Sequence, residues 1–131
     1  MLLVEDNPAD VLLVREALEE HSVQAEVLVV SDGEKAVEFI EAAETGDGPK
    51  PQLIILDLNL PKRSGHEVLR RIRDSRAVAN TRVVVLSSSD APKDRETAGR
   101  LGITDYIRKP SSLEDLSAVG LLLHRLLASS H

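Results

Sequence analysis

The chain reads Leu53-Ile54-Ile55-Leu56-Asp57-Leu58-Asn59-Leu60-Pro61 near its middle, where four apolar residues run directly into a single acid. A strand exposed on one face would alternate apolar and polar residues, so this run predicts a central parallel strand covered on both faces. Asp57 stands where that strand should end. Ligands of open α/β sheets bind at the carboxyl ends of the strands, so the acid is well placed for chemistry, although a carboxylate also ends many strands as a solvated turn residue.

Short apolar runs and helical segments alternate along the rest of the chain. The other expected strands cover residues 1–4, 25–30, 83–86 and 103–107. Helix starts are indicated by Asn7-Pro8, Asp32-Gly33, Ser64-Gly65 and Ala91-Pro92. Ser111 and Glu114 have the spacing of a capping box for a last helix over 112–127. This alternation predicts βαβ units, and therefore a doubly wound α/β fold with a five-stranded parallel sheet and five flanking helices.

Composition excludes several classes of protein. The 131 residues form one domain by length, and the absence of Cys excludes disulfides, thiolate catalysis and zinc–thiolate sites. No apolar run approaches the roughly 20 residues that span a bilayer, so we expect a soluble, cytoplasmic protein without a membrane partner. The net charge of -6 argues against nucleic-acid binding, which needs a basic surface, but leaves a protein partner open.

Polar side chains stand at four of the expected strand ends: Glu5-Asp6, Asp57, Ser87 and Lys109. If the ends converge, three carboxylates repel by about 3 kcal/mol per pair at about 5 Å and an effective dielectric constant near 20. A hard divalent cation relieves that repulsion, and Mg²⁺ suits the site because it binds through one or two carboxylates plus a substrate phosphate. Lys109 then supplies a charge for an anionic substrate, and Ser87 a hydroxyl for a phosphoryl oxygen. Each residue alone is more often a solvated surface group; their occurrence at successive strand ends favours a site.

These motifs resemble those of the receiver domain of two-component response regulators, over nearly the whole chain. The acidic pair lies in Leu2-Leu3-Val4-Glu5-Asp6-Asn7, and the phosphoacceptor segment is Leu56-Asp57-Leu58-Asn59-Leu60-Pro61, with Lys62 and Gly65 also in place. Ser87 falls at the family's Ser/Thr, Tyr106 at its aromatic switch position and Lys109-Pro110 at its Lys-Pro pair. The resemblance implies the strand order 2-1-3-4-5 and a single receiver domain over residues 1–131 with no output domain.

The resemblance also implies a mechanism. Asp57 would attack the phosphorus of a phosphohistidine on a sensor histidine kinase and form an acyl phosphate. Mg²⁺ (or Mn²⁺) would be held by Asp6, Asp57 and the Asn59 backbone carbonyl, with Glu5 acting mainly through water. Metal and Lys109 would offset charge on the transferring phosphoryl group. The protein would be a signalling switch, not an enzyme, apart from assisting its own phosphorylation and dephosphorylation.

A switch follows phosphorylation in the family. Ser87 would bond a phosphoryl oxygen, and Tyr106 would swing inward to fill the space left behind, which shifts the face made by helix 4, strand 5 and helix 5. A cis bond before Pro110 is expected to place Lys109; the alternative is a trans Pro in an ordinary turn.

Two surface features bear on partners. The last helix carries an apolar stripe wider than one buried face requires, and Leu121 lies outside it, which favours a homodimer through this helix over a few ordinary surface leucines. The breaker-rich loop over 45–51 looks like the stand-alone receivers paired with phytochrome-type sensor kinases. The run Arg70-Arg71-Ile72-Arg73 is interpreted as a solvated helix face, with contact to an acidic partner as the alternative.

Three alternatives remain beside the receiver interpretation. A flavodoxin-like cofactor binder would need a phosphate-cradling loop where this chain has Glu5-Asp6. A phosphohydrolase with an Asp nucleophile would want a second acid two residues after Asp57, where Asn59 stands. A degenerate receiver would keep the fold and act only as a protein-binding or dimerisation module.

Overall fold

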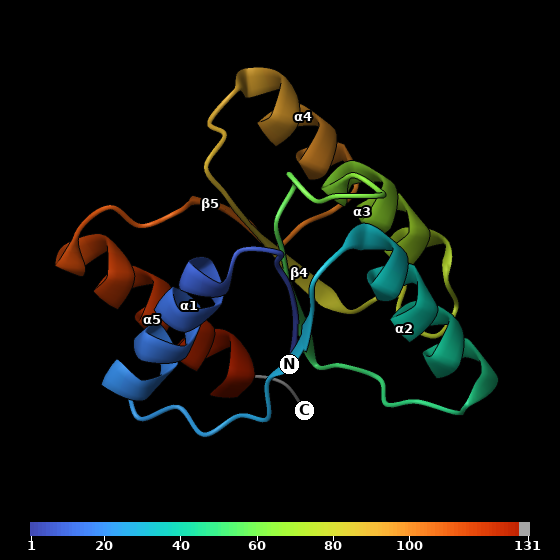
Figure 1. The fold of residues 1–131 in the computed structure, drawn as a ribbon, viewed down its shortest axis with the longest axis horizontal. Coiled ribbons are helices and arrows are strands. Elements are labelled where there is room, and N and C mark those ends of the chain that lie inside the picture. Colours follow the sequence, from blue (N-terminus) through green and yellow to red (C-terminus); the bar gives the residue numbers. More distant parts are fainter. Residues whose placement is uncertain (129–131) are drawn as a thin grey trace.

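The computed structural model describes residues 1–128, and within them one five-stranded parallel sheet runs in the order β2-β1-β3-β4-β5. The strands are β1 (Leu2–Val4), β2 (Leu28–Val30), β3 (Leu53–Leu56), β4 (Arg82–Ser87) and β5 (Asp105–Arg108). The helices are α1 (Pro8–Glu20), α2 (Gly33–Thr45), α3 (Gly65–Asp74), α4 (Pro92–Arg100) and α5 (Leu113–Ala128). Helices α1 and α5 lie together on one side of the sheet, and α2, α3 and α4 lie on the other (Figure 1). The doubly wound fold and the strand order are confirmed.

The sheet separates two apolar cores because successive residues of a strand point to opposite faces. Within β3, Ile54 and Leu56 pack under α2 and α3, whereas Leu53 and Ile55 pack under α1 and α5. All four side chains are buried, at 2% exposure or less. The unbroken apolar run of the sequence therefore reflects a strand covered on both faces, as predicted.

Most helix starts follow the expected caps. The side chains of Asn7, Asp32 and Ser64 each accept a backbone N–H bond at the start of α1, α2 and α3. The last helix differs by one residue, because Ser112 rather than Ser111 accepts the bond from the backbone N–H of Asp115, at 3.0 Å. Both serines precede an acid by three residues, so spacing alone did not distinguish them.

Strand β2 is shorter than the predicted 25–30. It lies at the edge of the sheet, and its neighbour there is β1, which is three residues long. Backbone pairing is therefore limited to Leu28, Val29 and Val30. Strand β5 begins two residues later than predicted, at Asp105, which pairs with Val84.

In the basic run of α3, Arg70 is exposed as interpreted, but the interpretation is wrong for Arg73. The guanidinium of Arg73 donates to the carbonyl oxygens of Leu101, Gly102, Ala79 and Thr81, at 2.7–3.0 Å. These carbonyls lie at the end of α4 and between α3 and β4, so one side chain ties three segments together.

Helix α5 packs its apolar stripe against α1 but leaves two leucines outside. Gly120 allows close packing, since a Cβ atom there would lie 2.4 Å from the carbonyl oxygen of Ala17 on α1. Leu116, Val119 and Leu123 are buried, whereas Leu113 is 84% and Leu121 42% exposed. In the described part of the chain, no helix combines the length and the apolar character needed to cross a membrane.

Candidate phosphoacceptor and metal site

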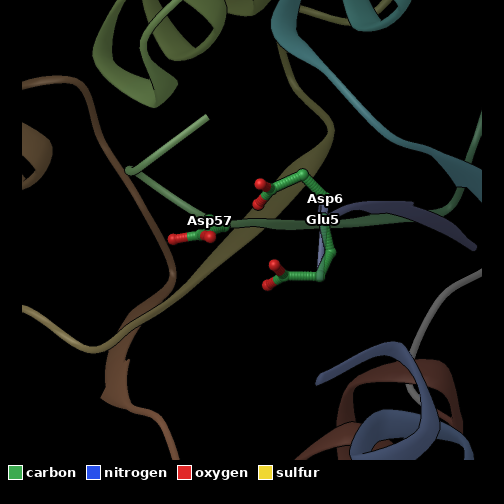
Figure 2. Close-up of side chains that lie close together, drawn as sticks. All are labelled: Glu5, Asp6 and Asp57. Atoms are coloured by element: carbon green, nitrogen blue, oxygen red, sulfur yellow. The ribbon is translucent and has the colours of Figure 1, made fainter. Parts of the chain in front are cut away.

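The acids at two neighbouring strand ends converge. Glu5 and Asp6 follow β1, Asp57 follows β3, and these strands pair directly. A backbone bond of 3.0 Å from the N–H of Asp57 to the carbonyl of Val4 fixes the two ends together. Carboxylate oxygens of Glu5, Asp6 and Asp57 lie within 4.8 Å of one another (Figure 2). The predicted clustering is therefore present in the structure.

The three acids differ in their exposure to water. Glu5 and Asp57 are buried, at 2% and 3% exposure, whereas Asp6 is exposed. Burial is the main cause that raises the pKa of Glu5 to about 7, and the nearby charge of Asp57 also raises it. The hydrogen bond from the backbone N–H of Asn7 and the ammonium of Lys109 act in the opposite direction and lower this pKa. Bringing these charges together out of water therefore carries an electrostatic cost, which a bound cation would reduce.

Lys109 is the cation of the site. Its Nζ atom lies 3.1 Å from Glu5 Oε2, 3.2 Å from Asp57 Oδ2 and 2.7 Å from Asp10 Oδ2. Burial alone would lower the pKa of Lys109, but the hydrogen bonds to Asp10 and Glu5 and the charges of Glu5 and Asp57 raise it above its ordinary value. The ammonium is therefore charged at neutral pH.

Asp10 is a member of this cluster that sequence reasoning missed. It stands in the first turn of α1, where an acid is favourable simply because of the helix dipole. Its contact with Lys109 joins residues 99 positions apart, so only the tertiary fold reveals it. The one available signal was its position four residues after Asp6, in the first turn of α1.

The turn after β3 folds around the Asp57 carboxylate. The backbone N–H of Asn59 donates to Asp57 Oδ1 at 3.1 Å, while Lys109 contacts Oδ2. Each carboxylate oxygen thus has a donor that orients it. The Asn59 backbone carbonyl remains a predicted metal ligand.

Ser87 is fully buried at the end of β4, beside β3. Its hydroxyl accepts a bond from the backbone N–H of Ser89, at 3.2 Å, and its carbonyl accepts one from the N–H of Lys109, at 2.8 Å. Ser87 therefore connects the β4–α4 loop to the lysine, and its contact with a phosphoryl group remains a prediction.

The position of the Tyr106 ring and the peptide bond before Pro110 differ from the expected switch geometry. The ring of Tyr106 is already buried, at 9% exposure, and its hydroxyl donates to the carbonyl of Ser89 at 2.8 Å. The cis bond expected before Pro110 is wrong, because no peptide bond in residues 1–128 is cis. The trans form is the intrinsically preferred one, and Lys109 is placed instead by its backbone bond to Ser87 and by the three carboxylates.

Comparisons with known proteins agree with this geometry. Response regulator Rcp1 of Synechocystis is 38% identical over 117 residues, covering 88% of this chain and 80% of Rcp1. The solved Mn²⁺-bound form of Rcp1 superposes with a TM-score of 0.85, covering 99% of this chain and 94% of that one. The phosphorylated cyanobacterial phytochrome response regulator RcpA gives a TM-score of 0.86 at 37% identity, with the same coverage.

A third structure carries the other expected metal. The receiver domain of sensor histidine kinase PA1611 from Pseudomonas aeruginosa, with magnesium coordinated in its active-site cleft, is 28% identical with a TM-score of 0.75, covering 98% of this chain and 96% of that one. The expected cofactors, Mg²⁺ and Mn²⁺, are thus the ions bound by two similar proteins. The family model described as the response regulator receiver domain matches residues 1–119, and the chain belongs to this family.

Proposed function

We propose that this chain is a phosphoaccepting signalling switch in which Asp57 takes a phosphoryl group from a sensor histidine kinase with the help of a divalent cation. The observation that carries the proposal is the group of Glu5, Asp6 and Asp57, three carboxylates beside the ammonium of Lys109. The phosphorylated structure of the similar protein RcpA supports it.

The donor set fits Mg²⁺ or Mn²⁺. Carboxylate oxygens are the ligands that hard divalent cations prefer, and one acid of the group is exposed, which leaves room for metal-bound water and for substrate. Asp6 and Asp57 would hold the ion together with the Asn59 carbonyl, and Glu5 would act mainly through water. When bound, the ion supplies positive charge that offsets the charge of the transferring phosphoryl group.

The residues of the chain divide the remaining work. An oxygen of Asp57 forms the new bond to phosphorus as the phosphorus–nitrogen bond of the phosphohistidine breaks, and that bond's electron pair returns to the ring nitrogen. Lys109 lies next to the nucleophile and neutralises part of the phosphoryl charge. Ser87 then bonds a phosphoryl oxygen, which couples the event to the β4–α4 loop through Ser89.

We further propose that the output is the face made by α4, β5 and α5. Ser89 connects Ser87 to Tyr106 of β5, so a shift of the β4–α4 loop is transmitted to that face. The resemblance to the phytochrome response regulator RcpA favours a phytochrome-type kinase as the partner. The predicted cytoplasmic location and absence of nucleic-acid binding remain predictions.

A homodimer through α5 is part of the proposal. The exposed Leu121 on this helix supports it. Sedimentation equilibrium should give a dimer for the wild type and a shift towards monomer for Leu121→Ser, whereas Leu12→Ser, at an exposed leucine of α1, should leave the mass unchanged. A wild-type monomer at all concentrations would contradict the dimer without affecting the phosphoacceptor.

Intact mass measurement tests the central proposal. After incubation with a small acyl-phosphate donor and Mg²⁺, the wild type and Asp74→Asn, a control at an exposed acid, should each gain one phosphoryl group. Asp57→Asn should gain none, and chelation of Mg²⁺ should abolish the wild-type gain. A folded wild type that binds Mg²⁺ without gaining mass would indicate a degenerate receiver that acts only as a binding module.

A further inference from the structure

The Lys109 ammonium is held from two directions. Glu5 and Asp57 contact it from the strand ends, at 3.1 and 3.2 Å, and Asp10 contacts it from the first turn of α1, at 2.7 Å. The ammonium donates hydrogen bonds to Asp10 and Asp57 and forms an ion pair with Glu5, so three carboxylates share its charge. The side chains of Lys109 and Asp10 are each 16% exposed, which limits the competition from water.

The three carboxylates that contact Lys109 differ in whether they belong to the candidate metal site of Glu5, Asp6 and Asp57. Glu5 and Asp57 belong to the acids whose oxygens lie within 4.8 Å of one another, and within residues 1–128 that group does not include Asp10. In the proposed function a cation would be held by Asp6 and Asp57, with Glu5 acting through water, and phosphorylation of Asp57 would use one of its oxygens. Asp10 is the partner of Lys109 that neither event requires.

The surroundings of the Asp10–Lys109 pair favour a fixed geometry. Both side chains border a gap too narrow for a water molecule, and its other lining residues are apolar or proline: Leu13, Val14, Leu86, Pro110, Leu116 and Val119. Because this lining offers the ammonium no competing side-chain acceptor, the carboxylate of Asp10 determines where the lysine head group rests on that side.

We infer that Asp10 is a positioning residue for the phosphoryl transfer proposed above, on which this inference rests. Asp10 anchors the ammonium of Lys109 from the α1 side. With a metal held by Asp6 and Asp57, an anchored ammonium would still direct an N–H towards Asp57 and would meet the arriving phosphoryl oxygen without first being reoriented.

The rate of phosphorylation by a small acyl-phosphate donor, at saturating donor and Mg²⁺, tests this role. Asp10→Ala should lower the maximal rate by about 10-fold to 100-fold, with the donor KM and the Mg²⁺ dissociation constant within about threefold of wild type. Asp10→Asn keeps a hydrogen-bond acceptor, so its maximal rate should lie between those of Asp10→Ala and wild type. Glu16→Gln, which removes an exposed charge from the same helix, should match wild type.

The same variants in a Lys109→Gln background distinguish a positioning role of Asp10 from a purely structural role. If Asp10 acts through Lys109, Asp10→Ala causes no further loss of rate there. Urea unfolding of the metal-free proteins gives a readout independent of activity, in which the double variant should be less destabilised than the sum of the single ones. Equal losses in both backgrounds would overturn the inference in favour of a structural role.

Two further outcomes distinguish the inference from the proposal on which it rests. Wild-type rates in Asp10→Ala, with Lys109→Gln impaired, would overturn the role of Asp10 and leave the phosphoacceptor function intact. Failure of the wild type itself to accept a phosphoryl group, with Mg²⁺ bound, would overturn both.

Discussion

A Cβ atom at Gly65 would lie 2.4 Å from the backbone carbonyl oxygen of Asp57. The same atom would lie 2.4 Å from the Cα of Leu58, so both close contacts are with backbone, which cannot rotate away. The N–H of Gly65 also donates to the carbonyl of Leu58 at 2.9 Å. The start of α3 is therefore pressed against the segment that carries Asp57, the proposed phosphoacceptor.

Gly65→Ala should therefore displace Asp57 as well as destabilise the fold. We expect a loss of about 1–3 kcal/mol in the free energy of unfolding, measured in urea, and a slower phosphorylation of the variant that remains folded. Gly99→Ala is the matched control, because a Cβ atom there meets nothing within 4 Å in α4, and it should stabilise by up to about 1 kcal/mol. Equal effects of the two substitutions would contradict the close approach.

Arg73→Lys should destabilise the protein although the charge is kept. The planar guanidinium reaches four carbonyl oxygens, just after α4 and between α3 and β4, and a lysine ammonium has neither the geometry nor the number of donors to do so. Partly buried carbonyls would lose their partners, at a cost of about 1–3 kcal/mol in urea unfolding. Arg70→Lys, at an exposed position of the same helix, should change stability by less than about 0.5 kcal/mol. A small effect at Arg73 would show that water replaces the guanidinium.

Much of the site was predictable because a parallel sheet brings strand ends to one edge. Glu5, Asp6, Asp57 and Lys109 each follow a run that the sequence marks as a strand, so their convergence follows from topology. Asp10 was not predictable in the same way. It belongs to a helix, and an acid in the first turn is already explained by the helix dipole, so the sequence does not indicate its contact with Lys109, 99 residues away.

Two other differences depend on tertiary contacts. Trans and cis forms of an X–Pro bond differ by only about 0.5–1 kcal/mol before tertiary contacts act, so the sequence around Pro110 contains no decisive signal. Arg73 reads as part of a charged helix face, and its burial depends on the distant end of α4. Both outcomes are decided by tertiary structure, which local pattern does not encode.

The pKa of Glu5 predicts a pH dependence of stability in the metal-free protein. Since this pKa rises from an ordinary value of 4.5 to about 7 on folding, the folded state binds the proton more tightly. The resulting stabilisation is complete below about pH 4.5 and is lost as the pH rises through 7. Above that pH, the buried carboxylate costs free energy.

Glu5→Gln removes this titration. In the presence of a chelator, the free energy of unfolding of the variant minus that of wild type should rise between pH 4.5 and 7, by on the order of 1–3 kcal/mol. Mg²⁺ should reverse the advantage at pH 8, because it stabilises the ionised wild-type site. A difference that stays flat across this pH range would show that Glu5 is not desolvated in solution.

Tyr106 is the only tyrosine and the chain has no tryptophan, so tyrosine fluorescence reports on this ring alone. The ring is buried, its hydroxyl is bonded to Ser89, and the guanidinium of Arg95 lies 4.5 Å from its centroid. A population that already lies inward cannot be shifted inward by phosphorylation.

Acrylamide quenching of Tyr106 should therefore be weak in the resting protein and should not decrease further after incubation with Mg²⁺ and an acyl-phosphate donor. Arg95→Ala should increase the quenching, because it uncovers one face of the ring, whereas Lys93→Ala on the same helix should not. Strong quenching at rest that falls on phosphorylation would instead show that the ring lies outward in solution and that Tyr106 itself moves in the switch.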